Sequence, residues 1–261
     1  MKFNLGLPTR IHQIMRSVIQ LSQVETLYAR AVQGEHLLPA EFAKRILEAL
    51  GIQVHLPPLS LQRLREIHAR QTPLIFAANH PFGAVDALTL MVMMGEIQPA
   101  FKFLANSIFE IIPELSPALI SMHIDGKTSP KENIASMKGA LRHLKQGGVL
   151  GLFPAGQVSE LPSWRSRKAE DQKWSAHLGG LIRRSQATVV PVAFEGQNSP
   201  LFLYAGLLAP RLRIALLVRE MLKHRKPVFP RIGTPIHYSD LLPWSSDLEI
   251  SARIRAMTYT L

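Results

Sequence analysis

The chain of 261 residues contains no cysteine. This absence excludes a disulfide framework, a cysteine nucleophile and thiolate metal sites, and it is consistent with a reducing compartment. Acidic residues are also scarce, because 19 Asp and Glu stand against 30 Lys and Arg, which gives a formal net charge of +11. Such an excess favours anionic partners: nucleic acid, acidic lipid surfaces, polyphosphate cofactors or acidic carrier proteins.

Long uninterrupted apolar runs are missing as well. Lys2 is not followed by a sustained apolar block, so the sequence has no pattern typical of a secretory signal peptide. The most apolar long segment extends from Leu201 to Leu222, and three arginines interrupt it: Arg211, Arg213 and Arg219. We therefore expect this segment to lie on a surface rather than to cross a bilayer. Hydrophobic residues still make up 47% of the chain, which is enough for a sizeable core.

The first part of the chain has helical patterns and no catalytic signal. These patterns predict an amphipathic helix within residues 1–30, a second helix from Pro39 to Leu50 that Gly51 ends, and a third around Leu59 to Arg70. We interpret residues 1–72 as a helical extension that either packs on the core or contacts a membrane. Residues 73–261 then form an α/β domain, and the two parts make one structural unit.

From residue 74 onward, short apolar runs alternate with helical patterns. The runs are 74–78, 100–106, 149–153 and 188–194, and each ends in a polar turn that contains Gly or Pro. This alternation predicts an α/β fold in which helices cover a central sheet. Because ligands of such sheets bind beyond the strand ends, we expect the turns at His80, Gly156 and Asn198 to converge on one cleft.

The sharpest local signal is the segment 79–86, which reads Asn-His-Pro-Phe-Gly-Ala-Val-Asp. Pro81 favours an extended His80, and Gly83 allows a sharp turn. Asp86 follows in the first turn of an apolar helix, where a buried carboxylate needs a partner. His80 can supply one, in which case Asp86 would orient the imidazole of a general base. The alternative is a helix-capping carboxylate beside an exposed loop histidine.

Four blocks together resemble the glycerolipid acyltransferase superfamily. The first, 79–86, has five residues between His and Asp where the common form has four, and it is similar to the hemolysin-like bacterial branch that includes lyso-ornithine-lipid O-acyltransferases. The others are 101–106, 153–159 and 189–199, and all four occur in the family's order within residues 74–202. The resemblance implies the glycerolphosphate acyltransferase fold, a central mixed, mostly parallel sheet flanked by helices.

The resemblance also implies roles for individual residues. His80 would be the catalytic base and Asp86 the acid that orients it. Lys102 and Asn106 would lie beside the acceptor head group, Gly156 and Ser159 near the reacting centre, and Pro191 at the acyl or acceptor pocket. The full set of implied substrate-binding residues is Asn79, Gly83, Lys102, Asn106, Phe153, Pro154, Ala155, Gly156, Ser159, Pro191 and Asn198. No bound cofactor is implied and no metal is expected, because no second His or Cys stands at ligand spacing from His80.

The third block departs from the family pattern Phe-Pro-Glu-Gly-Thr-Arg-Ser at two informative positions. Ala155 replaces the glutamate and Val158 replaces the arginine. Those two groups would engage a glycerol-phosphate head group. Their absence weakens the case for lysophosphatidic acid as the acceptor and leaves an aminolipid or another lysolipid open.

The implied reaction is O-acyl transfer from acyl-CoA or acyl carrier protein to a hydroxyl of a membrane lysolipid. Without a cysteine or a Gly-x-Ser-x-Gly elbow, direct transfer is favoured over a covalent acyl-enzyme, and backbone N–H groups near Gly156 would stabilise the oxyanion. We expect a peripheral protein on the cytoplasmic face of the inner membrane, with an anionic membrane surface and acyl carrier protein as partners. Its basic segments, Lys127 with Lys131, Arg165 to Lys173 and Arg211 to Arg225, would meet donor phosphates or lipid.

Two other functions stay open from the sequence. A thioesterase or hydrolase could use the same histidine and aspartate to activate water. A basic nucleic-acid-binding protein would account for the net charge, but no recognition motif of a known nucleic-acid-binding module is present, so we expect no nucleic-acid partner.

Overall fold

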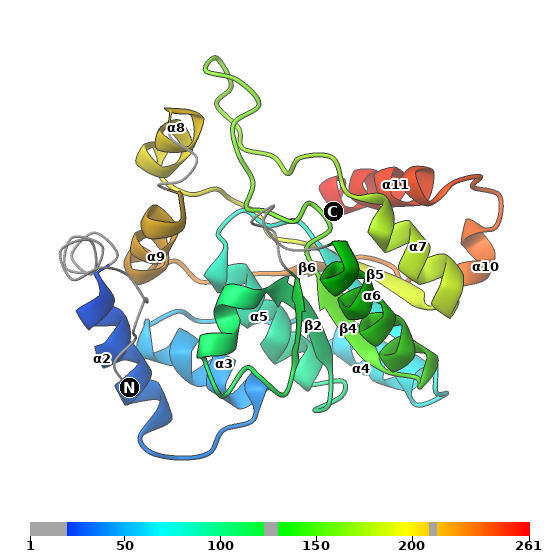
Figure 1. Ribbon diagram of the computed structural model, residues 1–261, viewed down its shortest axis with the longest axis horizontal. Coiled ribbons are helices and arrows are strands. Elements are labelled where there is room, and N and C mark those ends of the chain that lie inside the picture. The colour runs from blue at the N-terminus through cyan, green and yellow to red at the C-terminus, as the bar shows by residue number, and fades with distance from the viewer. Residues whose placement is uncertain (1–19, 123–129, 209–212) are drawn as a thin grey trace.

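A computed structural model describes residues 20–122, 130–208 and 213–261 (Figure 1). Most of the helix predicted within residues 1–30 therefore lies outside the described residues, which begin it only at α2 (Leu21–Val32). Lys127, Arg211 and the side chain of Lys131 lie outside them too.

The centre of the fold is a six-stranded sheet in the order β3-β2-β4-β1-β5-β6. Its strands are β1 (Leu74–Ala78), β2 (Lys102–Asn106), β3 (Leu119–Met122), β4 (Val149–Leu152), β5 (Thr188–Ala193) and β6 (Arg231–Ile232). All neighbouring strands are parallel except β5 and β6, which are antiparallel. The predicted mixed, mostly parallel sheet flanked by helices is confirmed. β3 and β6 were not predicted: β6 has only 2 residues, and the 4 residues of β3 are only partly buried and include a serine, so they form no apolar run.

Helices connect the strands and cover both faces of the sheet. They are α2, α3 (Pro39–Ala49), α4 (Pro58–His68), α5 (Ala84–Gly95), η1 (Ser107–Ile111), α6 (Pro130–Lys145), α7 (Ala176–Ser185), α8 (Pro200–Leu208), α9 (Arg213–Lys223), α10 (Tyr238–Leu241) and α11 (Asp247–Tyr259). The predicted bounds of α3 and α4 agree with the structure within about two residues. Gly95 is the last residue of α5, and Glu96 follows as the C-cap.

The side chains of β1 alternate between two apolar clusters. Leu74, Phe76 and Ala78 belong to a cluster with α2, α3, α4 and α5, whereas Ile75 and Ala77 belong to one with α6, α7 and α11. In Figure 1, α2, α3, α5 and α9 lie to the left of the sheet, and α6, α7 and α11 lie to its right. Because both faces are covered, β1 is a continuous apolar run rather than an alternating one.

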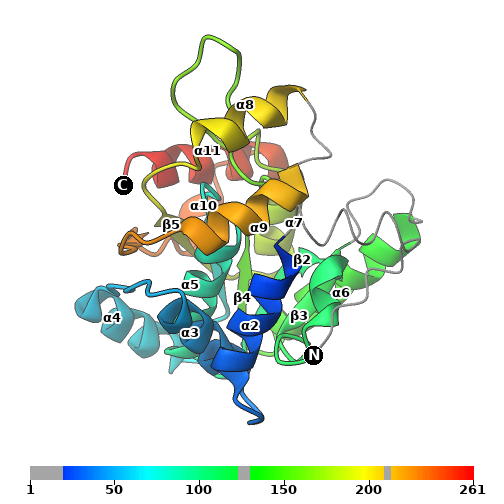
Figure 2. The same cartoon turned by 90° about the vertical axis from the view of Figure 1, so that its left-hand side faces the viewer.

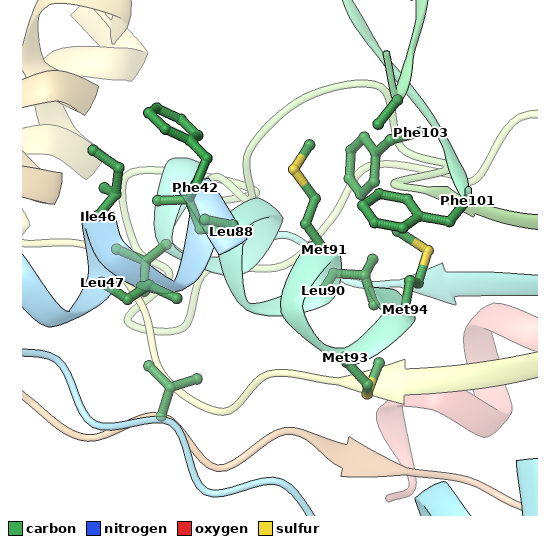
Figure 3. Close-up of a cluster of buried hydrophobic side chains, with 14 of the residues drawn as sticks. Phe42, Ile46, Leu47, Leu88, Leu90, Met91, Met93, Met94, Phe101 and Phe103 are labelled. Atoms are coloured by element: carbon green, nitrogen blue, oxygen red, sulfur yellow. The ribbon is translucent and has the colours of Figure 1, made fainter. Parts of the chain in front are cut away.

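Helix α5 is the most deeply buried helix next to the catalytic candidates. Figure 3 shows Phe42, Ile46 and Leu47 of α3 beside Leu88 of α5, while Met94 lies toward Phe101. The approach of α3 is so close that a Cβ on Gly95 would lie 2.3 Å from the Cβ of Ala40. An apolar helix of this kind needs partners on every side. Figure 2 shows α9 crossing the same side of the molecule near α2 and α5.

None of the helices within the described residues is both long enough and apolar enough to cross a membrane.

Candidate active site

The histidine and aspartate of the first block lie at the carboxyl end of the central strand. β1 ends at Ala78, and the turn after His80 leads into α5 through Gly83, whose φ of +84° favours glycine. The Nδ1 atom of His80 lies 3.2 Å from Oδ2 of Asp86. The same oxygen accepts the backbone N–H groups of Phe82 at 2.7 Å and Gly83 at 3.0 Å. The pairing expected from the sequence is therefore present.

Asp86 also performs the helix-capping role that the alternative interpretation gave it. Its hydrogen bonds to Phe82 and Gly83 satisfy N–H groups that the first turn of a helix leaves free. Asp86 therefore both caps the helix and pairs with His80, so the two interpretations of this carboxylate are compatible. The second half of the alternative, an exposed loop histidine, does not hold, because the His80 side chain is only 14% exposed.

The imidazole of His80 is held from several directions. The Phe153 ring stacks on it with centroids 3.6 Å apart and planes inclined by 15°. The backbone of His80 is fixed as well, since its N–H donates to Asp171 Oδ1 at 3.1 Å and its carbonyl accepts from Ser159 N at 2.9 Å. Among the described residues, Nε2 of His80 has no hydrogen-bond partner. This nitrogen is the one that a substrate could reach.

The electrostatics of the pair follow from burial. The side chain of Asp86 is fully buried. Burial raises the pKa of the Asp86 carboxyl, while the hydrogen bonds from His80, Phe82 and Gly83 oppose that rise. The second oxygen, Oδ1, accepts no hydrogen bond from any described residue. Oδ2 of Asp86 faces Nδ1 of His80, where a carboxylate would stabilise the imidazolium that forms while a general base holds a proton.

Asp171 is a second buried carboxylate at this site, and sequence reasoning missed it. Oδ1 accepts the His80 N–H and the Ser159 hydroxyl, the latter at 2.6 Å, and Oδ2 accepts the Trp174 indole N–H at 2.9 Å. Its own N–H donates to the hydroxyl of Tyr259 at 2.7 Å. The sequence places Asp171 inside a polar, basic segment, so no local pattern marked it as buried.

The third block reaches the same place from β4. Phe153 and Ser159 both contact His80, while Pro154 accepts the Ser175 N–H through its carbonyl and Ala155 packs against the apolar cluster of α7 and α11. Gly156, expected near the reacting centre, has a φ of +73° and donates its N–H to the Phe153 carbonyl at 2.9 Å. That N–H is used within the turn, so the backbone donor expected near Gly156 would have to be a neighbouring N–H group.

Lys102 does not reach this end of the sheet. It is the first residue of β2 and pairs with Leu150 of β4, which pairs with Ile75 of β1. Ile75 lies three positions before Ala78, the last residue of β1, and a strand rises about 3.3 Å per residue, so Lys102 lies roughly 10 Å short of the carboxyl end of β1 along the strand direction. The ammonium of Lys102 donates to the Pro117 carbonyl. Lys102 and Asn106, both expected beside the acceptor head group, are thus the two opposite ends of β2.

The remaining residues of the expected set have structural partners of their own. Asn79 links the ends of β1 and β5, because its amide donates to the Phe194 carbonyl at 2.9 Å and accepts the Phe194 N–H at 2.7 Å. Asn106 lies at the carboxyl end of β2 and caps η1 by accepting the Ile108 N–H at 3.0 Å. Pro191 is buried within β5 opposite Ala77.

Asn198 lies apart from these residues. It lines a groove between the segment after β5 and the segment that begins in α9. The three turns expected to form one cleft therefore form two neighbouring sites. His80 and the third block meet at one of them, and Asn198 belongs to the other.

Fold and site together define an α/β enzyme with a carboxylate-oriented histidine at the carboxyl edge of its central strand. A family model described as Acyltransferase matches residues 59–195, slightly more than half of the chain. The chain belongs to this family, the glycerolipid acyltransferase superfamily, and it is an acyltransferase. A search of curated proteins found no significant match.

Proposed function

We propose that the protein transfers a fatty acyl group from a thioester, acyl-CoA or acyl carrier protein, to a hydroxyl of a membrane lysolipid, with His80 as the general base. The observation that carries this proposal is the His80 imidazole, whose Nδ1 faces Asp86 at 3.2 Å while Nε2 has no partner among the described residues. Membership of the acyltransferase family supplies the reaction class.

The steps follow from that geometry. Nε2 of His80 takes the proton of the acceptor hydroxyl as its oxygen attacks the thioester carbonyl, and Asp86 stabilises the imidazolium that forms. The tetrahedral intermediate then collapses with cleavage of the carbon–sulfur bond, and the imidazolium returns the proton to the departing thiolate. The products are an ester and a free thiol, so atoms and charge balance.

Direct transfer is preferred over a covalent acyl-enzyme. Ser159 donates its backbone N–H to the His80 carbonyl, but its Oγ donates to Asp171 at 2.6 Å and not to the imidazole. A serine nucleophile needs an adjacent base to take its proton, and a carboxylate already held by three donors is poorly suited to that task.

For the acceptor we propose a lysophospholipid or a lyso-ornithine-type aminolipid, on the resemblance of the first block to the hemolysin-like branch. The side chain of Val158 packs in an apolar cluster with Leu161 and Phe202, so it offers no charge to a head group. The Arg213 guanidinium lies nearby, but it donates to the Val158 carbonyl and to Glu160, each at 2.7 Å. We further propose a peripheral location at the cytoplasmic face of the inner membrane.

The test is an acyl-transfer assay with purified protein. Labelled acyl-CoA and acyl carrier protein thioesters would be offered with a panel of lysolipids, and products would be identified by mass spectrometry. We expect esterified lipid from the wild type and a loss of about 100-fold or more in His80→Ala at unchanged thermal unfolding. Free fatty acid formed equally with and without lysolipid would indicate a hydrolase instead, and an active, folded His80→Ala would remove the proposed base.

A further inference from the structure

A groove with a volume of about 870 Å³ lies beside the candidate active site. One wall is the segment after β5, residues 194–201, and the other is the carboxyl half of α9 with the residues that follow it. Glu220 of α9 ties the two walls together, because it accepts the Ser199 N–H at 2.8 Å and the Ser199 hydroxyl at 2.7 Å. The groove is therefore a built feature rather than a gap between mobile segments.

The lining of this groove is positively charged. Five basic side chains contribute to it: Arg219, Lys223, Arg225, Lys226 and Arg231. Both of its carboxylates have partners, since Glu220 binds Ser199 and Glu195 pairs with Arg231. Arg219 and Lys223 form no ion pair with any residue that the structure describes. A concave surface with charge of one sign concentrates its potential and attracts anions.

Asn198 adds an independent signal in the same groove. Its side chain is only 6% exposed, and its Nδ2 has no acceptor among the described residues. A buried donor without an acceptor is unfavourable. If this amide turned toward the groove that Asn198 lines, a ligand rich in acceptor oxygens would satisfy it, whereas an apolar ligand would not.

The groove adjoins the His80 turn through Phe82. The Phe82 ring lines the groove and meets the His224 ring edge-on with centroids 4.9 Å apart, while the Phe82 N–H donates to Asp86. Gly196 lies against the same ring, and a Cβ there would be 2.4 Å from Phe82 Cζ. A ligand in the groove would thus be separated from the candidate catalytic pair by one aromatic side chain.

We propose that this groove binds a phosphate group of one of the two substrates. The shared chemistry is a phosphate ester whose oxygens accept from Arg219, Lys223 and Asn198. Its source is either the 3′-phosphoadenosine end of a coenzyme A donor or the head group of a lysophospholipid acceptor. The inference rests on the proposed function, which names the substrates that could carry this phosphate. Binding of the phosphate is nevertheless measured separately from catalysis.

The experiment measures binding by calorimetry on the full chain, with two probes: adenosine 3′,5′-bisphosphate for the donor and glycerol 3-phosphate for the acceptor. The variants are Arg219→Gln with Lys223→Gln, and Asn198→Asp, which keeps the size but replaces the donor with a negative charge. The matched control, Arg63→Gln with Arg70→Gln, removes the same charge from exposed positions on α4 and just after it.

We expect one probe to bind the wild type and the control equally, and to bind both groove variants at least about tenfold more weakly. The probe that binds identifies the source of the phosphate. Failure of both probes to bind, or equal binding by wild type and groove variants at unchanged thermal unfolding, would overturn the inference. If a probe binds as expected but the purified protein transfers no acyl group to any lysolipid, only the proposed function is contradicted.

Discussion

At the scale of single residues, Asp86 combines two functions that are usually separate. It caps α5 through the N–H groups of Phe82 and Gly83, and it faces the imidazole of His80. Capping explains why a carboxylate is tolerated on an otherwise apolar helix, and the histidine contact gives the carboxylate a chemical use. An amide in its place would keep an acceptor oxygen for the caps but could not stabilise an imidazolium.

This distinction predicts the outcome of Asp86→Asn. We expect acyl transfer to fall by at least about 100-fold, because the imidazole loses both its tautomer control and its counter-charge. Thermal unfolding should change little, since the substitution keeps the volume and removes a charge whose burial is unfavourable. Kinetics and unfolding of the same preparation check the prediction. Activity near the wild-type level would show that His80 works without the carboxylate.

We expect Asp171 to act by positioning His80 rather than by stabilising charge on its imidazole. It accepts the His80 N–H and the Ser159 hydroxyl but forms no hydrogen bond with the His80 imidazole. We expect Asp171→Asn to lower kcat by about tenfold, less than Asp86→Asn does, with little change in the pH at which the rate rises. A pH–rate profile separates the two roles, because a shifted acid limb in Asp171→Asn would mean that this carboxylate tunes the imidazole directly.

Tyr259 links the same network to pH-dependent stability. Burial, reinforced by the nearby Asp171 charge, raises the pKa of Tyr259 to about 12. A phenol whose pKa is higher in the folded than in the unfolded chain stabilises the fold below pH 10, and this contribution is lost as the pH rises through 12. We expect the free energy of unfolding to fall across that range, and to fall less in Tyr259→Phe. Urea unfolding of the wild type and of Tyr259→Phe at pH 9 and at pH 11 measures these free energies. An equal fall in the two proteins would contradict the assignment.

At the scale of elements, the contact between α7 and α11 depends on a glycine. A Cβ on Gly179 would lie 2.0 Å from the Asp247 carbonyl oxygen at the start of α11. We expect Gly179→Ala to destabilise the protein by about 1–3 kcal/mol, because backbone cannot yield as a side chain can. Gly139 in α6 is the matched control, since nothing lies within 4 Å of its Cβ position. Gly139→Ala should be neutral or stabilising by up to about 1 kcal/mol, as denaturant unfolding would show.

The elements also show which parts of the site could be predicted from the sequence. The His80 and Asp86 contact is local, separated by one turn, so residue types and spacing showed that it was possible, and the family resemblance favoured it over helix capping alone. The Asp171 contact with His80 joins residues 91 positions apart and depends on how a long segment after β4 folds back. The position of Lys102 at the start of β2 was not predicted, because a strand pattern does not say which residue begins the strand.

At the scale of the whole molecule, exposed apolar side chains gather beyond the carboxyl end of the sheet. Trp164, in the segment after β4, stacks on Tyr204 of α8 with centroids 5.9 Å apart. Leu201 and Leu208, at the two ends of α8, are exposed as well. Figures 1 and 2 both show α8 and the loop after β4 projecting together from one end of the molecule. We name Trp164, Leu201, Tyr204 and Leu208 the apolar tip.

The composition of the apolar tip suits a lipid interface. Trp and Tyr favour the boundary between head groups and acyl chains, and basic residues favour anionic head groups. Arg165, Arg167 and Lys168 follow Trp164 directly in the chain. A tip that enters the bilayer would bring the carboxyl edge of the sheet, and with it His80, toward the membrane surface. A lysolipid could then approach the imidazole without leaving the lipid phase entirely.

This arrangement predicts that the protein binds anionic vesicles through the apolar tip. We expect Trp164→Ser with Leu208→Ser, which changes no charge, to weaken vesicle sedimentation several-fold, because each side chain removed takes apolar area from the interface. Leu59→Ser with Leu242→Ser removes equally exposed apolar side chains elsewhere and should bind as the wild type does. Added salt should weaken binding in all three proteins, since the basic residues remain. Binding that ignores both salt and the tip substitutions would mean that another surface contacts the membrane, and His80 would then have to receive its acceptor from solution.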